Sequence, residues 1–202
     1  MMLMMHDFKE GSAMAANWTD VEKDTATGLP VMLAQNVIAG TALSVGALAC
    51  SGFYLSMIGN VASLVPWALM VTLVAVAFTY VVGFALLWCV ESFTLRMREK
   101  FKPIAYGVVG AIGYGVWGMF VMSSLMNSLD QPINGVVLAN GDIAALTVNY
   151  AVFGFIAYLL AQAYGKALAA RKGLAIGLLV AQVALAALGL VVGVMMFSAL
   201  AH

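Results

Sequence analysis

Residues 173–201 read GLAIGLLVAQVALAALGLVVGVMMFSALA, a stretch with no charged residue and a single amide, Gln182, about a third of the way along it. A helix needs about 20 mostly apolar residues to cross the roughly 30 Å hydrocarbon core of a bilayer. This stretch is long and apolar enough to do so. It is therefore predicted to be a transmembrane helix.

Four further stretches have the same character, so the predicted fold is all-α: a polytopic membrane bundle of five transmembrane helices. The chain of 202 residues is 64% apolar and only 9% charged, and its mean hydropathy is +1.01. A soluble domain is about 45–50% apolar and about 25% charged, which excludes an ordinary soluble globule. We predict a partly disordered or interfacial tail at 1–29 and one membrane domain at 30–202, with spans at 37–59, 64–90, 104–126, 143–165 and 173–201.

The basic residues fall on one side of this predicted topology. Two lie in the N-terminal tail, four between the second and third spans, and three between the fourth and fifth: Lys9, Lys23, Arg96, Arg98, Lys100, Lys102, Lys166, Arg171 and Lys172. The positive-inside rule makes this side cytoplasmic. We therefore predict a cytoplasmic N-terminus and an external C-terminus, in a plasma or inner membrane.

Two connections have a distinctive composition. Residues 91–102 mix apolar and basic side chains and are predicted to continue the second helix into the membrane interface. They are either a solvated, snorkelling helix end or a docking site for anionic lipid or a partner. Residues 127–142 hold two Asn-Gly pairs around four apolar residues, which predicts a loop with a short extended segment on the outer face.

Small residues mark the faces along which these helices are predicted to pack, because close approach drives helix association in lipid. Gly110 and Gly118 are the packing candidates in the third span. The fifth span holds two pairs four residues apart, Gly173 with Gly177 and Gly189 with Gly193. At about 100° per residue these pairs face nearly opposite directions. That pattern fits contact with a neighbouring subunit or with a second copy, and also a monomer in which the fifth helix is central.

Four polar residues within the spans are candidates for an intramembrane polar site: Gln182, Gln162, Asn149 and Tyr150. Such groups hydrogen-bond between helices or, less often, bind a small solute. Gln182 is the deepest of them and has small neighbours, so it is the strongest candidate.

Several chemistries are not expected from this sequence. No Asp, Glu, Lys, Arg or His is predicted at mid-span, where an ionisable residue would indicate a functional site. The two histidines, His6 and His202, lie at the chain ends, and Cys50 and Cys89 lack the paired spacing of a redox exchanger. Basic and acidic residues balance, so nucleic-acid binding is not expected. We therefore expect no enzyme activity, no cofactor and no metal site.

Two functional hypotheses remain. The first is a non-catalytic integral membrane subunit or scaffold that packs through its small-residue faces against other membrane proteins or itself. The second is a transport component for a small neutral or apolar solute, bound by a few convergent polar groups.

Overall fold

The computed structural model describes residues 29–57 and 64–200, and within these ranges the chain is helical with no strand. Five helical units are long and apolar enough to cross a membrane: Val31–Ala49, Leu64–Thr94, Glu99–Pro132, Asn140–Ala170 and Lys172–Ala199. The predicted all-α, multi-pass membrane bundle of five helices is therefore confirmed. Apart from Leu29, the predicted N-terminal tail lies outside the described residues.

Several units are built from more than one helical segment. In the first unit, α2 (Val31–Ala49) is continued beyond the span by the short helix α3 (Ser51–Met57). The second comprises α4 (Leu64–Phe78), the π-helical turn η1 (Thr79–Gly83) and α5 (Phe84–Thr94). The third comprises the 3-10 turn η2 (Glu99–Phe101), α6 (Lys102–Trp117), the π-helical turn η3 (Gly118–Met122) and α7 (Ser123–Asn134). The last two are the continuous helices α8 (Asn140–Ala170) and α9 (Lys172–Leu200).

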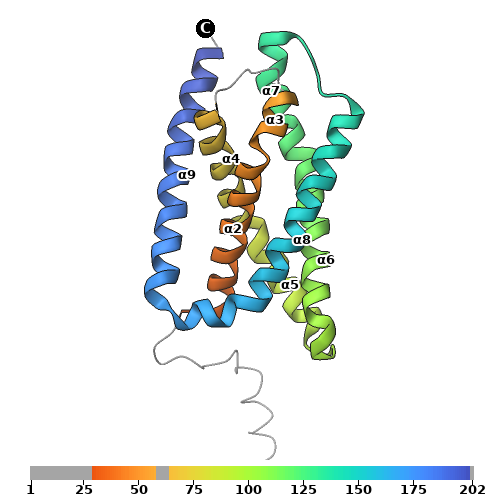
Figure 1. Ribbon diagram of the computed structural model, residues 1–202, viewed down its shortest axis with the longest axis vertical. Helices are drawn as coiled ribbons and strands as arrows, with labels where there is room; N and C mark the ends of the chain where they lie inside the picture. The colour runs from red at the N-terminus through yellow and green to blue at the C-terminus, as the bar shows by residue number, and fades with distance from the viewer. Residues whose placement is uncertain (1–28, 58–63, 201–202) are drawn as a thin grey trace, which may run out of the picture.

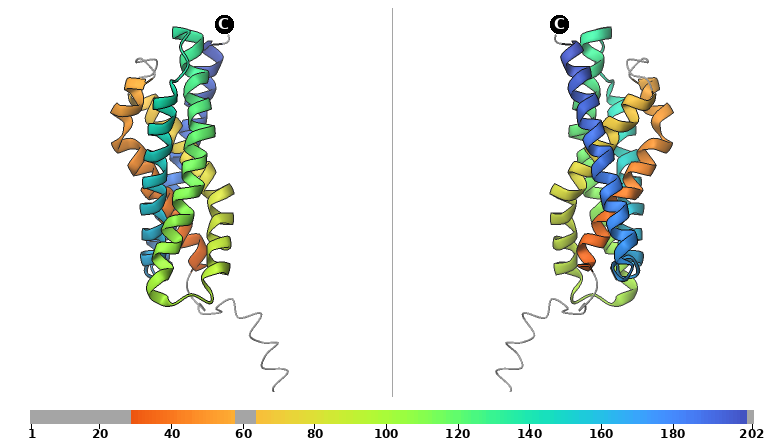
Figure 2. Two further views of the ribbon diagram at one scale, coloured as in Figure 1. Left: turned by 90° about the vertical axis from the view of Figure 1, so that its right-hand side faces the viewer. Right: turned by 90° about the vertical axis from the view of Figure 1, so that its left-hand side faces the viewer.

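The helices run roughly along one axis, with α9 at one edge and α6 and α8 toward the other (Figure 1). Seen from the α9 side, this helix lies in front of the rest of the bundle (Figure 2). The α5–α6 and α8–α9 turns lie at the same end, at the bottom of Figure 1. We call it the basic end, because Arg96, Lys100, Lys166 and Lys172 lie in or next to these turns.

Close helix packing places the core between α2, α6 and α8. The contact between α6 and α8 is the most extensive, followed by those of α2 with α8 and α4 with α9. Buried Tyr114 and Tyr158 belong to a cluster in the middle of the bundle, and buried Tyr54, Trp67 and Met122 to a cluster farther from the basic end. By contrast, only 17% of the most apolar stretch of the last helix is buried. The alternative of a central fifth helix is therefore wrong.

The first helix begins earlier than its predicted start at residue 37. It starts at Val31, after Pro30, whose carbonyl accepts the backbone N–H groups of Leu33 and Ala34. The apolar-run criterion excluded Gln35 and Asn36, yet both lie inside α2 and are buried. Hydropathy failed here because these amides face the bundle interior rather than lipid.

The prediction that the second helix continues through residue 102 is wrong. Helix α5 ends at Thr94, and the chain turns through residues 95–98 before η2 and α6. Arg98 is extended, with ψ of 138°, and Pro103 lies in the first turn of α6. Proline is well placed there because the first N–H groups of a helix lack intrahelical partners. The chain must also reverse here for the third helix to pack back against the second.

The predicted loop at 127–142 is mostly helical instead. Helix α7 continues to Asn134 with Pro132 inside it, and α8 already begins at Asn140. Only residues 135–139 are non-helical. Gly135 ends α7 in the left-handed region, with φ of 66°, as glycine commonly does after a helix. The backbone N–H of Leu138 donates to Asn127 Oδ1 at 2.8 Å, which fixes this short segment to α7.

Candidate functional site

The π-turn η1 is the centre of a buried polar network. Its geometry is visible in the backbone N–H of Phe84, which donates five residues back to the Thr79 carbonyl. Turns of this kind inside helices often lie at functional sites. The Tyr158 hydroxyl donates to the Gly83 carbonyl at 2.8 Å. The turn is thereby tied to α8.

A second bond ties the same turn to α6. Thr79 Oγ1 and the Tyr114 hydroxyl lie 3.0 Å apart, and both residues are buried. Thr79 already donates its hydroxyl proton to the Ala75 carbonyl at 2.7 Å. Tyr114 is therefore the donor to Thr79 Oγ1. All of these groups are neutral.

Gln182 joins α9 to this network and to α2. Its Nε2 donates to the Val37 carbonyl at 2.8 Å and to Thr41 Oγ1 at 2.5 Å, and its Oε1 accepts from the Tyr80 hydroxyl at 2.9 Å. A Cβ at Gly40 would lie 3.0 Å from Oε1, so a glycine at this position leaves room for the amide. Gln182, the strongest polar candidate from the sequence, thus donates both of its amide protons to groups inside the bundle.

Asn149 and Tyr150 belong to a separate polar cluster, farther from the basic end. The Tyr54 hydroxyl donates to Asn149 Oδ1, and Asn149 Nδ2 lies 3.6 Å from Cys50 Sγ. The rings of Tyr54 and Tyr150 stack with centroids 5.9 Å apart. These contacts tie α8 to α3, just after the break in the first helix at Cys50.

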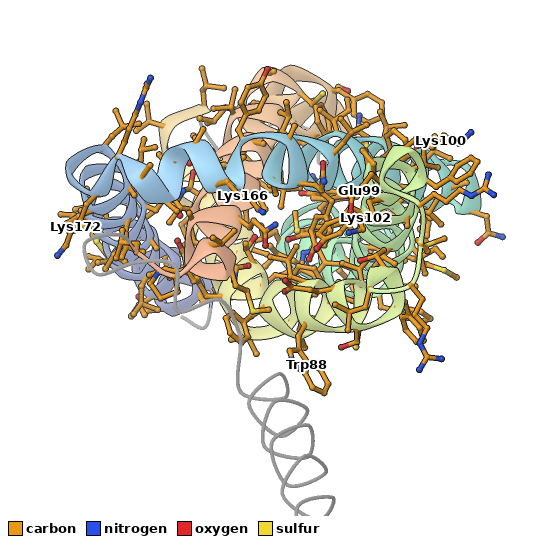
Figure 3. The ribbon with its side chains drawn as sticks, turned by 90° about the horizontal axis from the view of Figure 1, so that it is seen from below. Trp88, Glu99, Lys100, Lys102, Lys166 and Lys172 are labelled. Carbon is orange, nitrogen blue, oxygen red and sulfur yellow. The ribbon has the colours of Figure 1, made fainter. Side chains whose placement is uncertain are left out.

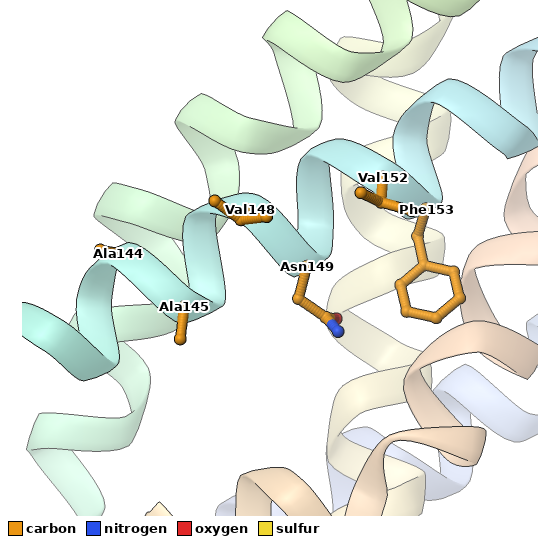
Figure 4. Close-up of a pocket in the computed structure, with 6 residues that line it drawn as sticks. All are labelled: Ala144, Ala145, Val148, Asn149, Val152 and Phe153. Carbon is orange, nitrogen blue, oxygen red and sulfur yellow. The ribbon is translucent and has the colours of Figure 1, made fainter.

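Asn149 also lines an open groove of about 540 Å³ on the surface of α8. The other lining residues are apolar: Ala144, Ala145, Val148, Val152 and Phe153. In Figure 4 the Asn149 amide and the Phe153 ring point from α8 toward the ribbon of the first unit. A Cβ at Gly46 of α2 would overlap that ring, so Phe153 packs directly on the first helix. The groove therefore carries one amide on an otherwise apolar wall.

The four polar candidates do not form one site. Gln162 is half-buried on α8 toward the basic end, and at 1.5 Å per residue it lies about 20 Å along the helix from Asn149. Gln182 is on α9, with partners on α2 and η1. The structure brings together only Asn149 and Tyr150.

The predicted packing glycines differ in what they contact. A Cβ at Gly110 would overlap the Gly154 carbonyl oxygen, and one at Gly118 would lie 2.9 Å from Tyr150 Cβ. A Cβ at Gly189 would overlap the Leu69 carbonyl oxygen of α4. Gly189 therefore makes an intramolecular contact, as Gly110 and Gly118 do.

The other three glycines of the fifth helix have open space at the Cβ position. Gly193 is buried, yet a Cβ there would meet nothing within 4 Å. Gly173 and Gly177 are exposed, and a Cβ at either would likewise meet nothing within 4 Å. Of the two predicted faces of α9, the structure uses the one toward α4 and leaves the one with Gly173 and Gly177 open.

The seven predicted basic residues that the structure describes lie at one end but in two groups. Arg96, Arg98, Lys100 and Lys102 surround the α5–α6 turn, and Lys166, Arg171 and Lys172 surround the α8–α9 turn. Seen from the basic end, Lys100 and Lys172 lie on opposite sides of the bundle (Figure 3). Within residues 29–57 and 64–200, the one ion pair joins Lys102 Nζ and Glu99 Oε1 at 2.6 Å.

Sequence reasoning missed Tyr114 and Tyr158, although the sequence holds a signal for them. Each follows a glycine by four residues, Gly110 in α6 and Gly154 in α8. A Cβ at Gly154 would lie 2.7 Å from Tyr114 Cβ, and one at Gly110 would lie 2.7 Å from Tyr158 Cγ. The two glycine–tyrosine pairs thus pack reciprocally at the α6–α8 crossing. This repeated spacing predicts the crossing point.

Sequence reasoning also passed over Asn36. Its side chain is fully buried in α2, and neither Nδ2 nor Oδ1 has a hydrogen-bond partner among the described residues. A buried amide without partners is costly, by about 1–3 kcal/mol for each unmet group. Among the described residues, Asn36 has two such buried atoms, whereas Trp67 and Tyr150 have one each, Nε1 and the hydroxyl.

The chemistry available in these clusters is hydrogen bonding between neutral groups. In the described part of the chain, no group of three or more His, Cys, Asp and Glu side chains is arranged to hold a metal ion. Comparison with known proteins adds no assignment, since no family model, curated protein or solved structure matches this chain.

Proposed function

We propose that this chain is a non-catalytic subunit or scaffold of a larger membrane assembly, held to its partner through the open face of α9. The observation that carries the proposal is the contrast between glycines. At Gly110 and Gly189, the backbone of a neighbouring helix occupies the space where a Cβ would lie. At Gly173 and Gly177, nothing lies within 4 Å of that position.

Open glycines are unfavourable in a helix that faces only lipid. Glycine costs about 1 kcal/mol relative to alanine in a helix interior, and lipid gives no close backbone contact in return. Helices associate in bilayers through faces of small residues four apart, because these let two backbones approach. Gly173, Gly177 and the exposed Ala181 and Ala184 supply such a face near the basic end of α9. A partner helix packed there would offset the cost.

The hydrogen bonds of Gln182 also favour the subunit or scaffold function over solute binding. Its amide protons are donated to Val37 and Thr41, and its oxygen accepts from Tyr80. A solute would have to displace these bonds. We infer that Gln182 anchors α9 to the bundle, so that the opposite face of α9 is held in a fixed position for a partner.

The test is the substitution Gly177→Leu in the full chain, expressed at native level and purified in mild detergent. Because nothing lies within 4 Å of that Cβ position, the change is expected to leave the fold intact. Size-exclusion chromatography with light scattering and mass spectrometry should show a stoichiometric partner, or a second copy, with the unmodified chain. The Gly177→Leu variant should elute alone.

Gly52→Leu is the matched control. Gly52 is also an exposed helical glycine with nothing within 4 Å, but it lies on α3. This variant should keep the partner. An unmodified chain that elutes alone, or a Gly177→Leu variant that retains its partner, contradicts the proposal.

The groove beside Asn149 favours a second candidate function, transport of a small neutral or apolar solute. It combines five apolar side chains with one amide, the composition expected of a site for such a solute. Asn149→Leu should then abolish solute uptake by liposomes while association in detergent is unchanged. Uptake that is equal in both forms would count against this candidate.

A further inference from the structure

The turn between α5 and α6 combines strongly exposed apolar side chains with cations. Phe93 is 77% exposed and Leu95 75% exposed, at the end of α5 and just beyond it. Arg96, Arg98 and Lys100 follow within five residues and are all exposed. Apolar and cationic groups are thus interleaved on one short segment at the basic end.

The backbone holds this segment in a compact shape. The N–H of Met97 donates to the Thr94 carbonyl at 3.0 Å, and the N–H of Phe101 donates to the Arg98 carbonyl at 2.9 Å. The first bond closes the end of α5, and the second closes η2. The side chains between them are therefore presented from a fixed turn rather than from a long loop.

The charge on this turn is largely uncompensated. Lys102 is paired with Glu99, and among the described residues this is the one ion pair. The guanidinium groups of Arg96 and Arg98 therefore lack a carboxylate within 4 Å in that part of the chain. Lys100 Nζ lies 5.1 Å from the centre of the Phe101 ring, so one ammonium is held beside an apolar surface.

The α8–α9 turn has cations beside less exposed apolar surface: Leu174 is 55% exposed and Tyr164 59% exposed, less than Phe93 and Leu95. Arg171 alone separates the two helices, between Lys166 and Lys172. The residues directly beside these cations are small: Ala167, Ala170 and Gly173. The two basic groups of the same end therefore differ in how much exposed apolar surface lies beside them.

We propose that the α5–α6 turn is a binding site for the headgroup of an anionic phospholipid in the leaflet at the basic end. The guanidinium groups of Arg96 and Arg98 bind the phosphate, since arginine matches phosphate oxygens with two parallel N–H donors. Phe93 and Leu95 insert among the acyl chains below the headgroup. This inference is independent of the proposed partner contact on α9.

The experiment is native mass spectrometry of the full chain released from mixed micelles with equal amounts of phosphatidylglycerol and phosphatidylcholine. The ratio of phosphatidylglycerol to phosphatidylcholine adducts should be well above one. Each cation near an anionic lipid surface contributes roughly fivefold to binding. The variant with Arg96→Gln, Arg98→Gln and Lys100→Gln should therefore lower the ratio at least about tenfold.

The matched control carries Lys166→Gln, Arg171→Gln and Lys172→Gln, with the same loss of charge at the same end. Its ratio should fall clearly less than that of the first triple variant, because general attraction to an anionic surface is lost in both variants and the bound headgroup only in the first. A variant with Phe93→Ser and Leu95→Ser keeps all charges and should lower total lipid retention. Thermal unfolding in detergent should be equal for all forms, because the changed side chains are exposed.

Three outcomes would overturn the inference. Equal loss of lipid selectivity in the two triple variants would show that charge at this end acts diffusely and not through a site. Competition by inorganic phosphate as effective as by phosphatidylglycerol would show an anion site without lipid recognition. A protein partner that binds the turn in place of lipid would appear as a protein adduct lost in the first triple variant, and it would equally refute the lipid assignment.

Discussion

Replacing Gln182 by leucine tests whether the amide is structural. The two side chains have similar volume, so the substitution removes polarity more than packing. Three hydrogen bonds would be lost, those to the Val37 carbonyl, Thr41 Oγ1 and the Tyr80 hydroxyl. These are the side-chain hydrogen bonds that tie α9 to the described remainder of the bundle.

The magnitude follows from the behaviour of such bonds in membranes. They average about 0.6 kcal/mol each and reach about 1.7 kcal/mol, so three of them give about 2 kcal/mol. The partners keep other options after the change. Thr41 Oγ1 still donates to the Val37 carbonyl at 2.7 Å, and Tyr80 is only half-buried. The full penalty of three orphaned groups is therefore not expected.

The assay is equilibrium unfolding in mixed micelles with increasing dodecyl sulfate. Gln182→Leu should lower the free energy of unfolding by about 2 kcal/mol. In a double-mutant cycle with Tyr80→Phe, the coupling should be about 0.6 kcal/mol. The control is Gln162→Leu on α8, a half-buried amide for which no hydrogen bond is found among the described residues, and it should cost less than about 0.5 kcal/mol.

The reasoning is refuted if Gln182→Leu is no more destabilising than Gln162→Leu. It is also refuted if Gln182→Leu preserves stability and abolishes solute transport, because the amide would then serve a ligand and not the bundle. A coupling near zero with Tyr80→Phe would mean that their bond is not formed in the membrane.

Two further predictions concern the α6–α8 crossing and use the same unfolding assay. Gly110→Ala should destabilise the bundle by about 1–3 kcal/mol, since the new methyl group overlaps backbone at Gly154. The control Gly177→Ala on α9 should be neutral or stabilising by up to about 1 kcal/mol. Equal effects of the two substitutions would contradict the packing at Gly110. Tyr158→Phe should cost about 0.6–1.7 kcal/mol through loss of its bond to the Gly83 carbonyl, and an unchanged midpoint would show that the π-turn does not need this donor.

Hydropathy predicted the five helices because each must present about 20 apolar residues to lipid whatever it packs against. The same rule misplaced the start of the first helix, where Gln35 and Asn36 face inward. It also misplaced the end of the third, where α7 runs on to Asn134 with polar residues and Pro132 inside it. Hydropathy identifies segments whose side chains contact lipid, so it misses helical segments whose residues are polar.

The polar network was only partly predictable. The depth of Gln182 follows from its place in an apolar run, but its partners depend on how α2, α9 and η1 are rotated about their axes. No periodicity in the sequence marks the π-turn at Thr79–Gly83. Because such a turn rotates all later residues of the helix about its axis, the faces of α5 could not be predicted either. The glycine–tyrosine pairs of α6 and α8 are the exception, since both helices repeat one spacing and pack reciprocally there.

The two proposed contacts should act independently. The small-residue face of α9 lies near Lys172, whereas the α5–α6 turn lies near Lys100, on the other side of the same end (Figure 3). Substitutions at sites that share no partners combine additively. A chain with Gly177→Leu should therefore lose its protein partner and keep its preference for phosphatidylglycerol. The Arg96, Arg98 and Lys100 triple variant should do the reverse. If either change abolished both properties, the protein partner and the lipid would have to share one surface, and the assignment of separate contacts to α9 and the α5–α6 turn would be wrong.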